Sequence, residues 1–444
     1  MSVITRFAPS PTGTLHVGNI RAALHNWMWA RKHGGRFLLR LDDTDRERSR
    51  PEYADAIRAD LAWLGLQPDD EVSQSDRFAL YDAQFDRLKA AGRVYPAWET
   101  PQELDLKRKI LASRGLPPVY DRAALTQEPP ADRTPHWRFK LDHDEPLAWI
   151  DLVRGPQAFD PKTMSDPIIR RADGSWLYLL PSVIDDIDMG ITHVVRGEDH
   201  VSNTAVQLQM FSALEARAPT FAHEALLTGS EGKLSKRLGS LGVSTFREQG
   251  IEPVAIVALL ARLGTSLPVE PIADPAPLID SFDFARFGRA PARFDEAELA
   301  ALNQRIVHML SYDAVASRLP AGMDAAAWDA IRPNLETVDQ VADWWSVVTG
   351  PLATPVLEAE DAAFVAQAAE TLAALDFGPE SWRALTDALK SATDRKGKRL
   401  FLPLRLALTA RDHGPDMAAL LPLIGRDVAL ARLRAASEHG ASVS

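Results

Sequence analysis

The sequence contains no cysteine and no long hydrophobic run. Without cysteine the chain has no disulfide, no thiol nucleophile and no zinc site built from thiolates. No apolar stretch approaches the roughly 18 residues that a membrane-spanning helix needs. The N-terminus also lacks the basic start and apolar stretch of a signal peptide. We therefore expect a cytoplasmic protein that binds no membrane.

Positive charge is in deficit, because the chain contains 50 Lys and Arg residues but 61 Asp and Glu residues. Its formal net charge is −11. Net charge alone would argue against a nucleic-acid partner, but phosphate binding depends on local patches. Basic residues do cluster, at Arg46, Arg48 and Arg50, at Lys107, Arg108 and Lys109, at Arg170 and Arg171, and at Arg395, Lys396, Lys398 and Arg399. Each cluster taken alone has the simpler interpretation of a solvated face.

The order of predicted elements indicates an α/β fold. A length of 444 residues predicts two to four domains. Residues 3–8 form a predicted strand, 17–34 a helix and 36–41 the next strand. A second helix follows, with Ser49 as its cap and Gly65 at its end. This alternation predicts a parallel sheet.

From about residue 93 prolines and short strand-like runs replace this alternation. The runs cover 136–141, 147–150, 168–171 and 176–178, with a hairpin turn signal at 172–175. We interpret this stretch as an insertion into the sheet.

The sheet is predicted to resume at 191–195, followed by a helix over 199–213 and a short strand at 225–228. Helices dominate from about residue 244, and no strand signal occurs beyond about 320. The C-terminal half is therefore predicted to be all-helical.

The first segment that carries chemistry is Pro9-Ser-Pro-Thr-Gly-Thr-Leu-His-Val-Gly-Asn19, a loop that leaves a strand and opens a helix. Helix N-termini present N–H groups and positive partial charge, which suit a phosphate. Gly13 is expected to let the loop turn, and Gly18 to leave room for a nucleotide. His16 can donate a hydrogen bond to a phosphate that gains charge. Taken alone, such a unit is common and its histidine is more often structural.

The second segment is Lys233-Leu-Ser-Lys-Arg237, which follows a Gly/Ser-rich stretch. Three cations within five residues suit a mobile clamp on a polyphosphate, with lysines as point charges and arginine as a fork. An exposed basic turn is the better interpretation of this segment by itself.

Together the two segments resemble the signature of class I aminoacyl-tRNA synthetases. His16-Val-Gly-Asn19 is similar to their HIGH element, and Lys233-Leu-Ser-Lys-Arg237 to their KMSKS loop. Within that class the resemblance is to bacterial glutamyl-tRNA synthetases, through Arg6-Phe-Ala-Pro-Ser-Pro-Thr-Gly13, Asp43-Thr-Asp45, Asp185-Asp186 and Ile191-Thr-His-Val-Val-Arg-Gly-Glu-Asp199. It runs from residue 3 to about 265 and fades in the helical region.

The resemblance implies a Rossmann-like catalytic domain in two halves, 1–80 and 185–243. Between them, 81–184 would be an inserted α+β domain that binds the tRNA acceptor end. A helical stem-contact region at 244–320 and a helical anticodon-binding region at 321–444 would follow. Arg395 to Arg399 are candidate phosphate contacts there.

The implied reaction joins glutamate to ATP as an adenylate and transfers it to the 3′ end of tRNA(Glu), with release of AMP and pyrophosphate. Mg²⁺ would accompany ATP on its phosphates. By resemblance His16, Lys233 and Lys236 are catalytic, through positioning and charge stabilisation. The implied ATP-binding residues are Pro9, Ser10, His16, Gly18, Asn19, Asp199, Leu226, Leu227, Lys233, Leu234, Ser235, Lys236 and Arg237, with adenine near the two leucines.

The glutamate pocket needs a partner for an acidic side chain, and the fork of arginine matches a carboxylate. By resemblance Arg6 and Arg196 take this part, and an ion pair with a nearby Asp or Glu is the structural alternative for both. The other implied pocket residues are Ala8, Ser10, Asp42, Tyr178 and Ser182.

Two positions depart from common family patterns. The family commonly has glutamate at Asp42, facing the substrate's ammonium group, and often asparagine at Ser182. Both side chains here are shorter, which leaves the exact contacts open. Val94 to Trp98, where some bacterial members carry zinc, holds no cysteine. No zinc and no protein-built metal site are therefore predicted.

Several alternatives stay open. A glutaminyl enzyme is expected to have a β-barrel anticodon region, and a relative that glutamylates a queuosine base lacks the helical one. A small-molecule nucleotidyltransferase is generally much shorter. A noncatalytic paralogue would not need His16, Lys233 and Lys236. The enzyme could also glutamylate tRNA(Gln), and by family a monomer is expected.

Overall fold

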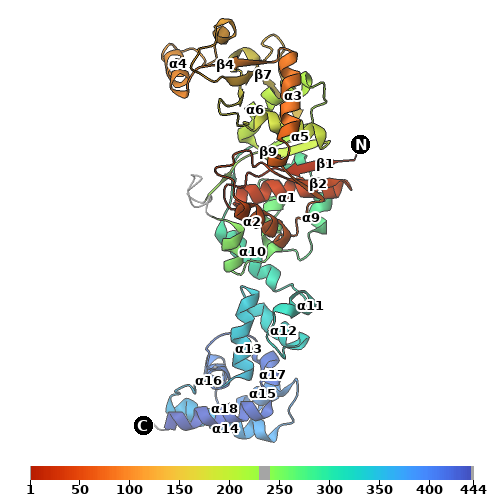
Figure 1. The fold of residues 1–444 in the computed structure, drawn as a ribbon. Helices are drawn as coiled ribbons and strands as arrows, with labels where there is room; N and C mark the ends of the chain where they lie inside the picture. Colours follow the sequence, from red (N-terminus) through yellow and green to blue (C-terminus); the bar gives the residue numbers. More distant parts are fainter. Residues whose placement is uncertain (1, 230–240, 442–444) are drawn as a thin grey trace. The chain divides into compact units, whose positions relative to one another are not determined.

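The computed structural model describes residues 2–229 and 241–441, which fall into two compact units. Unit 1 comprises residues 1–249, 253–270 and 274–296, and unit 2 comprises 250–252, 271–273 and 297–444. Figure 1 colours both units along the sequence. The predicted five-part division stays a prediction.

Unit 1 is built on parallel strands from two separate stretches of chain. These strands are β1 (Ile4–Phe7), β2 (Arg36–Leu41), β3 (Asp70–Ser73), β9 (His193–Gly197) and β10 (Thr220–Glu224). β2 lies between β1 and β3, with Ile4 opposite Arg36, and β9 pairs with β10. β9 also lies beside β1, where the Thr192 N–H donates to the Ile4 carbonyl at 2.9 Å. The strand order is therefore β3-β2-β1-β9-β10, and it changes direction between β1 and β9.

The helices of unit 1 pack on these strands and on one another. They are α1 (Val17–Lys32), α2 (Pro51–Trp63), α3 (Phe78–Ala90), α4 (Pro101–Ser113), α5 (Leu179–Asp188), α6 (Val201–Ala213), α7 (Val243–Glu248), α8 (Pro253–Arg262) and α9 (Ala276–Ser281). α1 contacts β1, β2 and β9, while α5 packs against α3 and α6. Tyr81, Phe85, Leu180 and Val183 belong to one buried core cluster there.

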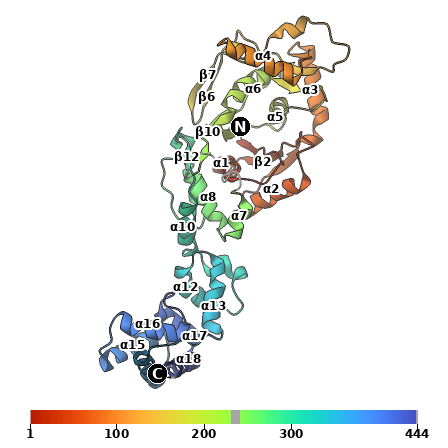
Figure 2. The same ribbon diagram turned by 90° about the vertical axis from the view of Figure 1, so that its left-hand side faces the viewer.

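The stretch interpreted as an insertion contains its own strands between α3 and α5. Its strands are β4 (Val94–Ala97), β5 (His136–Phe139), β6 (Leu147–Asp151), β7 (Gly155–Phe159) and β8 (Ile168–Arg170). β4, β5 and β8 make an antiparallel sheet, and β6 and β7 make a hairpin that lies beside β10 (Figure 2). The predicted turn at 172–175 is present, with Gly174 at φ +87°. Two short strands, β11 (Leu227–Thr228) and β12 (Ala292–Arg293), pair in parallel.

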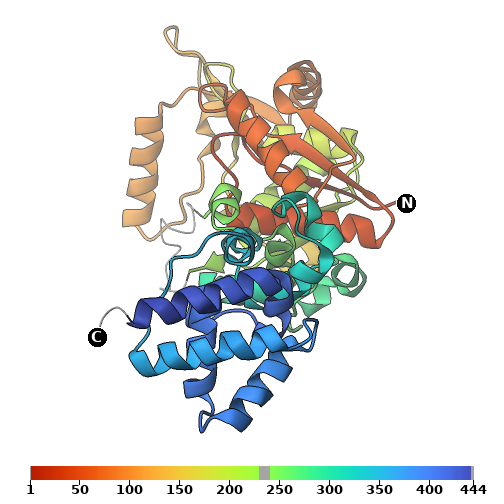
Figure 3. The same ribbon diagram turned by 90° about the horizontal axis from the view of Figure 1, so that it is seen from below.

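Unit 2 is helical, as the sequence predicts. Its helices are α10 (Glu296–Val307), α11 (Tyr312–Val315), α12 (Ala325–Ile331), α13 (Val341–Thr349), α14 (Ala359–Ala374), α15 (Ser381–Ala392), α16 (Lys398–Thr409), α17 (Met417–Ile424) and α18 (Arg426–Ala441). α14 and α18 lie side by side (Figure 3). The described residues of this unit contain no strand. In the part of the chain that the structure covers, none of the helices has the length and apolar character to span a bilayer.

Three local predictions were wrong. Ser49 does not cap α2, because its N–H donates to the Asp45 carbonyl in the preceding turn and Arg50 takes the cap position. Residues 176–178 form only an isolated bridge at Trp176, since Tyr178 already has helical backbone angles at the start of α5. β10 was missed because it ends in the buried polar residues His223 and Glu224, which break any apolar pattern.

Candidate active site

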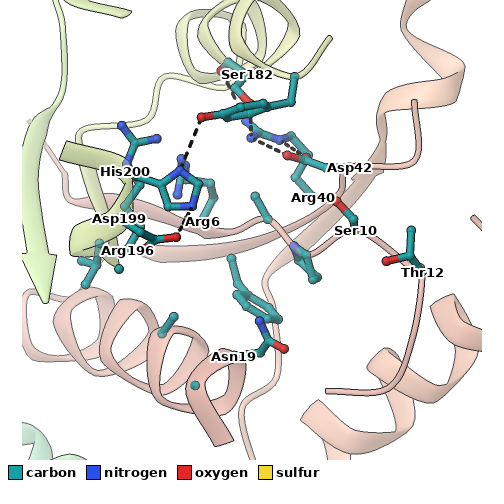
Figure 4. A pocket seen from close by; sticks show the side chains of 18 of the residues that line it. Arg6, Ser10, Thr12, Asn19, Arg40, Asp42, Ser182, Arg196, Asp199 and His200 are labelled. Carbon is teal, nitrogen blue, oxygen red and sulfur yellow. Dashed lines mark hydrogen bonds and ion pairs between the residues drawn. The ribbon is translucent and has the colours of Figure 1, made fainter. Parts of the chain in front are cut away.

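A large cavity of unit 1 lies where the strand order changes direction. Open α/β sheets bind ligands at the carboxyl ends of their strands at such a switch point. β1 and β9 end there, and they place Arg6 and Arg196 on the wall of a cavity of about 700 Å³ (Figure 4). That volume suits a small-molecule substrate together with a nucleotide.

Every described residue that the sequence predicted for the site lines this one cavity. These are Arg6, Ala8, Pro9, Ser10, His16, Gly18, Asn19, Asp42, Tyr178, Ser182, Arg196, Asp199, Leu226 and Leu227. The predicted lysine loop, Lys233, Leu234, Ser235, Lys236 and Arg237, lies outside the described residues. The shared cavity supports the grouping, while the role of each residue stays a prediction.

His16 stands at the N-cap of α1. Its Nδ1 accepts a hydrogen bond from the Gly18 N–H at 3.2 Å, and its own N–H donates to Asn19 Oδ1 at 3.3 Å. Burial lowers the pKa of His16, which favours the neutral ring. Because Nδ1 is an acceptor, the ring proton is on Nε2, and the ring can offer it to a ligand.

The start of α1 offers fewer free donors than expected. The Val17 N–H donates to the Leu241 carbonyl at 3.2 Å, and the Gly18 N–H is taken by His16. Phosphate contact at this end would therefore depend on His16 Nε2, the Asn19 amide and the helix dipole. Gly13 does not have the positive φ that would make glycine necessary for a turn.

Arg6 and Arg40 are buried and neutralised by carboxylates. Arg6 Nε lies 3.1 Å from Asp186 Oδ1, so the structural alternative of an ion pair holds for this arginine. Arg40 donates from Nε to Asp42 Oδ1 at 2.7 Å and from Nη1 to Asp186 Oδ1 at 2.8 Å. These contacts raise the pKa of Arg40. The Asp185-Asp186 pair in the sequence thus supplies buried counter-charge: Asp185 accepts from Tyr81, and Asp186 from both arginines.

Sequence reasoning missed Arg40, although it lines the cavity. An arginine flanked by leucines inside the apolar strand 36–41 was the available signal, since a buried charge needs partners. Arg40 Nη2 also donates to Asp42 Oδ2 and to Ser182 Oγ, each at 3.3 Å. Arg40 therefore fixes Asp42 and Ser182, the two side chains that depart from the family pattern. Burial raises the pKa of Asp42, and Arg40 opposes that shift.

Arg196 differs from both, because neutral groups hold it. Its Nη2 donates to Thr204 Oγ1 at 2.6 Å and to Gln207 Oε1 at 2.7 Å, and its Nε donates to His223 Nε2 at 3.3 Å. Within the described residues it forms no ion pair with Asp or Glu. Burial, together with Arg6, lowers the pKa of Arg196 to about 10, so it stays charged at neutral pH. An anionic ligand would supply the missing counter-charge.

The two leucines expected near adenine also line the cavity. Leu226 is 38% exposed, which is unusual for a leucine beside a core strand. Its N–H already donates to Glu198 Oε1 at 3.1 Å, and its carbonyl accepts from the Ala292 N–H at 3.1 Å. Leu226 therefore presents its apolar side chain to a ligand in place of a free N–H.

Comparisons with known proteins agree with this fold. A family model described as tRNA synthetases class I (E and Q), catalytic domain, matches residues 2–301. A second, described as an anticodon binding domain, matches residues 308–437. Glutamate–tRNA ligase 1 of Rhizorhabdus wittichii is 70% identical over 98% of this chain and 100% of its own length.

The chain belongs to the glutamate–tRNA ligase family. Glutamate–tRNA ligase 2 of Sphingopyxis alaskensis is 67% identical over 98% of this chain and 99% of its own. The crystal structure of a glutamate–tRNA ligase from Elizabethkingia meningosepticum, in complex with its amino acid, superposes with a TM-score of 0.85. It is 27% identical and covers 99% of both chains. The class I fold inferred from the sequence is confirmed.

In the anticodon-binding region of this glutamate–tRNA ligase, one predicted contact needs correction. Arg395 is 7% exposed, ion-paired with Asp361 and with Glu360, and stacked on the ring of Phe364 at 4.5 Å. A guanidinium held in this way stabilises α14 and is not available to a phosphate. Lys396 and Lys398 are exposed.

Proposed function

We propose that this chain activates L-glutamate with ATP in the cavity of unit 1 and transfers it to tRNA(Glu). As a glutamate–tRNA ligase it attaches glutamate to tRNA, and it uses ATP to do so. The proposal concerns which residues carry each step and which tRNA is the substrate.

One observation carries the assignment of the glutamate site. Arg196 is a charged guanidinium in the cavity wall whose hydrogen-bond partners are neutral, whereas Arg6 and Arg40 share Asp186. The side-chain carboxylate of glutamate would neutralise Arg196 in a fork geometry. Asp42, Tyr178 and Ser182 lie across the cavity and would face the amino-acid backbone of the substrate.

The nucleotide would occupy the other side of the cavity. Its phosphates would face His16 Nε2, the Asn19 amide and the dipole of α1. Mg²⁺ arrives with ATP on its phosphates. Among the described residues no group of three His, Asp or Glu is arranged to hold a metal ion, so these phosphates would be its main ligands. Adenine would pack on Leu226, and Lys233 and Lys236 would neutralise pyrophosphate.

The glutamate site is tested with Arg196→Ala. We expect the KM for glutamate to rise about a hundredfold or more, because a buried charged contact is lost, while the KM for ATP changes little. ATP–pyrophosphate exchange with tRNA present measures both constants. Arg217→Ala, at an exposed position before β10, is the matched control. Equal losses for glutamate and ATP would mean that Arg196 has only a structural role.

The choice of tRNA is tested with aminoacylation of purified tRNA(Glu) and tRNA(Gln). We expect charging of tRNA(Glu) alone. Comparable charging of tRNA(Gln) would assign the chain to the enzymes that use both tRNAs.

A further inference from the structure

The hydrogen-bond donors of Arg196 divide into two groups. A guanidinium has five N–H bonds, one on Nε and two on each terminal nitrogen. The Nε–H is directed to His223, and the two on Nη2 to Thr204 and Gln207. Within the described residues Nη1 has no hydrogen-bond partner. The three ties therefore fix the plane of the guanidinium and leave Nη1 for a ligand.

His223 can hold Arg196 in only one tautomer. It is fully buried on β10, and Nε2 must be unprotonated to accept the Arg196 Nε–H. The other ring nitrogen, Nδ1, lies 2.5 Å from Asp151 Oδ2. A carboxylate at Nδ1 keeps the proton there, because a charged acceptor binds an N–H strongly. Burial also lowers the pKa of His223, which keeps the ring neutral.

Asp151 comes from the insertion, at the end of β6. Its Oδ1 accepts three backbone N–H groups, from Val153 at 3.0 Å, Arg154 at 2.9 Å and His223 at 3.1 Å. Burial opposes its ionised form, but the hydrogen bonds from His223 and the backbone lower the pKa of Asp151. The carboxylate is thus ionised and fixed in orientation, with Oδ2 directed at His223.

We propose that Asp151 and His223 are positioning residues for glutamate binding: Asp151 fixes the His223 tautomer, and His223 in turn orients Arg196 toward the substrate carboxylate. The inference rests on the proposed role of Arg196. The neutral contacts leave the positive charge of Arg196 available to a ligand. The Asp151 carboxylate contacts His223, and it is His223 that contacts Arg196. The hairpin of the insertion is thereby part of the amino-acid site.

The decisive variant is Asp151→Asn. The three backbone donors at Oδ1 hold the amide oxygen in place, so the amide NH₂ faces His223 Nδ1. The ring proton must then move to Nε2, where it opposes the Arg196 Nε–H. We expect the KM for glutamate to rise about ten- to hundredfold, and the KM for ATP to stay within about twofold. The control is Asp160→Asn, an exposed residue of the insertion that only caps a short turn.

The tautomer itself is observable. In the whole enzyme labelled with ¹⁵N-histidine, the NMR signals of the His223 ring should show the proton on Nδ1 in the wild type and on Nε2 in Asp151→Asn. His223→Gln assigns these signals by their loss. A tautomer switch without a change in the KM for glutamate overturns the proposal, and so does a rise in that KM without a switch.

A second pair of variants guards against misfolding of Asp151→Asn. The amide of His223→Gln can accept from Arg196 and should keep the KM for glutamate within a few-fold of wild type. His223→Leu cannot accept, and should raise it at least tenfold. Equal values for the two variants overturn the proposal.

Combining Asp151→Asn with Arg196→Ala distinguishes failure of the positioning role from failure of the proposed glutamate site. There, Asp151→Asn should add no further rise in the KM for glutamate, since the residue that it positions is gone. If Arg196→Ala is glutamate-specific while Asp151→Asn has no effect, only the positioning role fails. If Arg196→Ala is not glutamate-specific, the proposed glutamate site itself fails.

Discussion

At the scale of single residues, three arginines around one cavity have different surroundings. Arg40 lies on β2 among Asp42, Asp185 and Asp186, and Arg6 shares Asp186 with it. The hydrogen-bond partners of Arg196 among the residues that the structure describes are all neutral. Removal of one partner from a buried ion pair is destabilising, whereas a buried charge without a counter-charge is a candidate ligand site.

Arg40→Leu should therefore destabilise unit 1. The change leaves several buried carboxylates without their shared cation, and loss of one partner of such a group costs about 3–5 kcal/mol. Urea unfolding followed by tryptophan fluorescence measures the loss. Arg36→Leu, on the same strand with a half-exposed ion pair to Asp70, should cost at most about 1 kcal/mol. Similar losses for both variants would contradict this assignment.

At the scale of the element, α1 is capped by the residue that is also expected to contact phosphate. Gly18 makes this possible, because a Cβ there would lie 3.1 Å from His16 Cε1 and 3.2 Å from Nδ1. The cap fixes Nδ1 as acceptor and directs the remaining ring proton to the cavity. The N-cap of α1 and the expected orientation of the His16 ring thus depend on the same hydrogen bond.

Gly18→Ala should displace the His16 ring by a few tenths of an ångström. We expect the rate of adenylate formation to fall about tenfold, since small misplacements of catalytic groups are costly, with little change in the KM for glutamate. Single-turnover ATP–pyrophosphate exchange measures the rate. Gly13→Ala lies in the same loop with no described atom within 4 Å of the added Cβ, and should be nearly neutral. A rate unaffected by Gly18→Ala would argue against His16 as a phosphate contact.

At the scale of the whole molecule, an acidic chain has to bind an acidic polymer. With a net charge of −11, long-range attraction cannot carry tRNA binding, so local cations must. Unit 2 offers Lys396 and Lys398 at the start of α16, while the neighbouring Arg395 is committed to Glu360 and Asp361. Exposed and paired cations in one short segment therefore have different surroundings.

Replacing both Lys396 and Lys398 with alanine should weaken tRNA binding without loss of stability. If each contacts one phosphate, the slope of log affinity against log salt should fall by about two. Filter binding at several salt concentrations measures this slope. Arg395→Ala is the comparison, and should lower the unfolding midpoint of unit 2. An unchanged salt slope in the double variant would place the tRNA backbone elsewhere.

The sequence predicts features that depend on neighbouring residues, but not contacts between residues far apart along the chain. The strand–loop–helix of 3–34 was predicted because its apolar spacing and glycines are local, and most site residues followed from the resemblance to glutamyl-tRNA synthetases. Asp151 and His223 are 72 positions apart, and neither lies in a motif. Only the pairing of β6 beside β10 brings them together, and that contact is a property of the folded chain.

Arg6 shows a different limit of sequence reasoning. The motif placed it in the amino-acid site, and the structure does put it on the cavity wall. An ion pair was the structural alternative for Arg6, but its partner Asp186 could not be identified from the sequence, because it is 180 positions away. The sequence thus indicated where the Arg6 side chain lies. The carboxylate that pairs with it was identified only from the structure.

The origin of Asp151 in the insertion has a consequence for engineering. The next residues of the same hairpin turn reach the nucleotide side as well, since Arg154 pairs with Glu198 and Glu198 accepts from the Leu226 N–H. A chimera that exchanges the insertion for that of another synthetase would therefore change both substrate pockets at once. Grafts meant to alter only tRNA preference should keep residues 147–159 of the recipient.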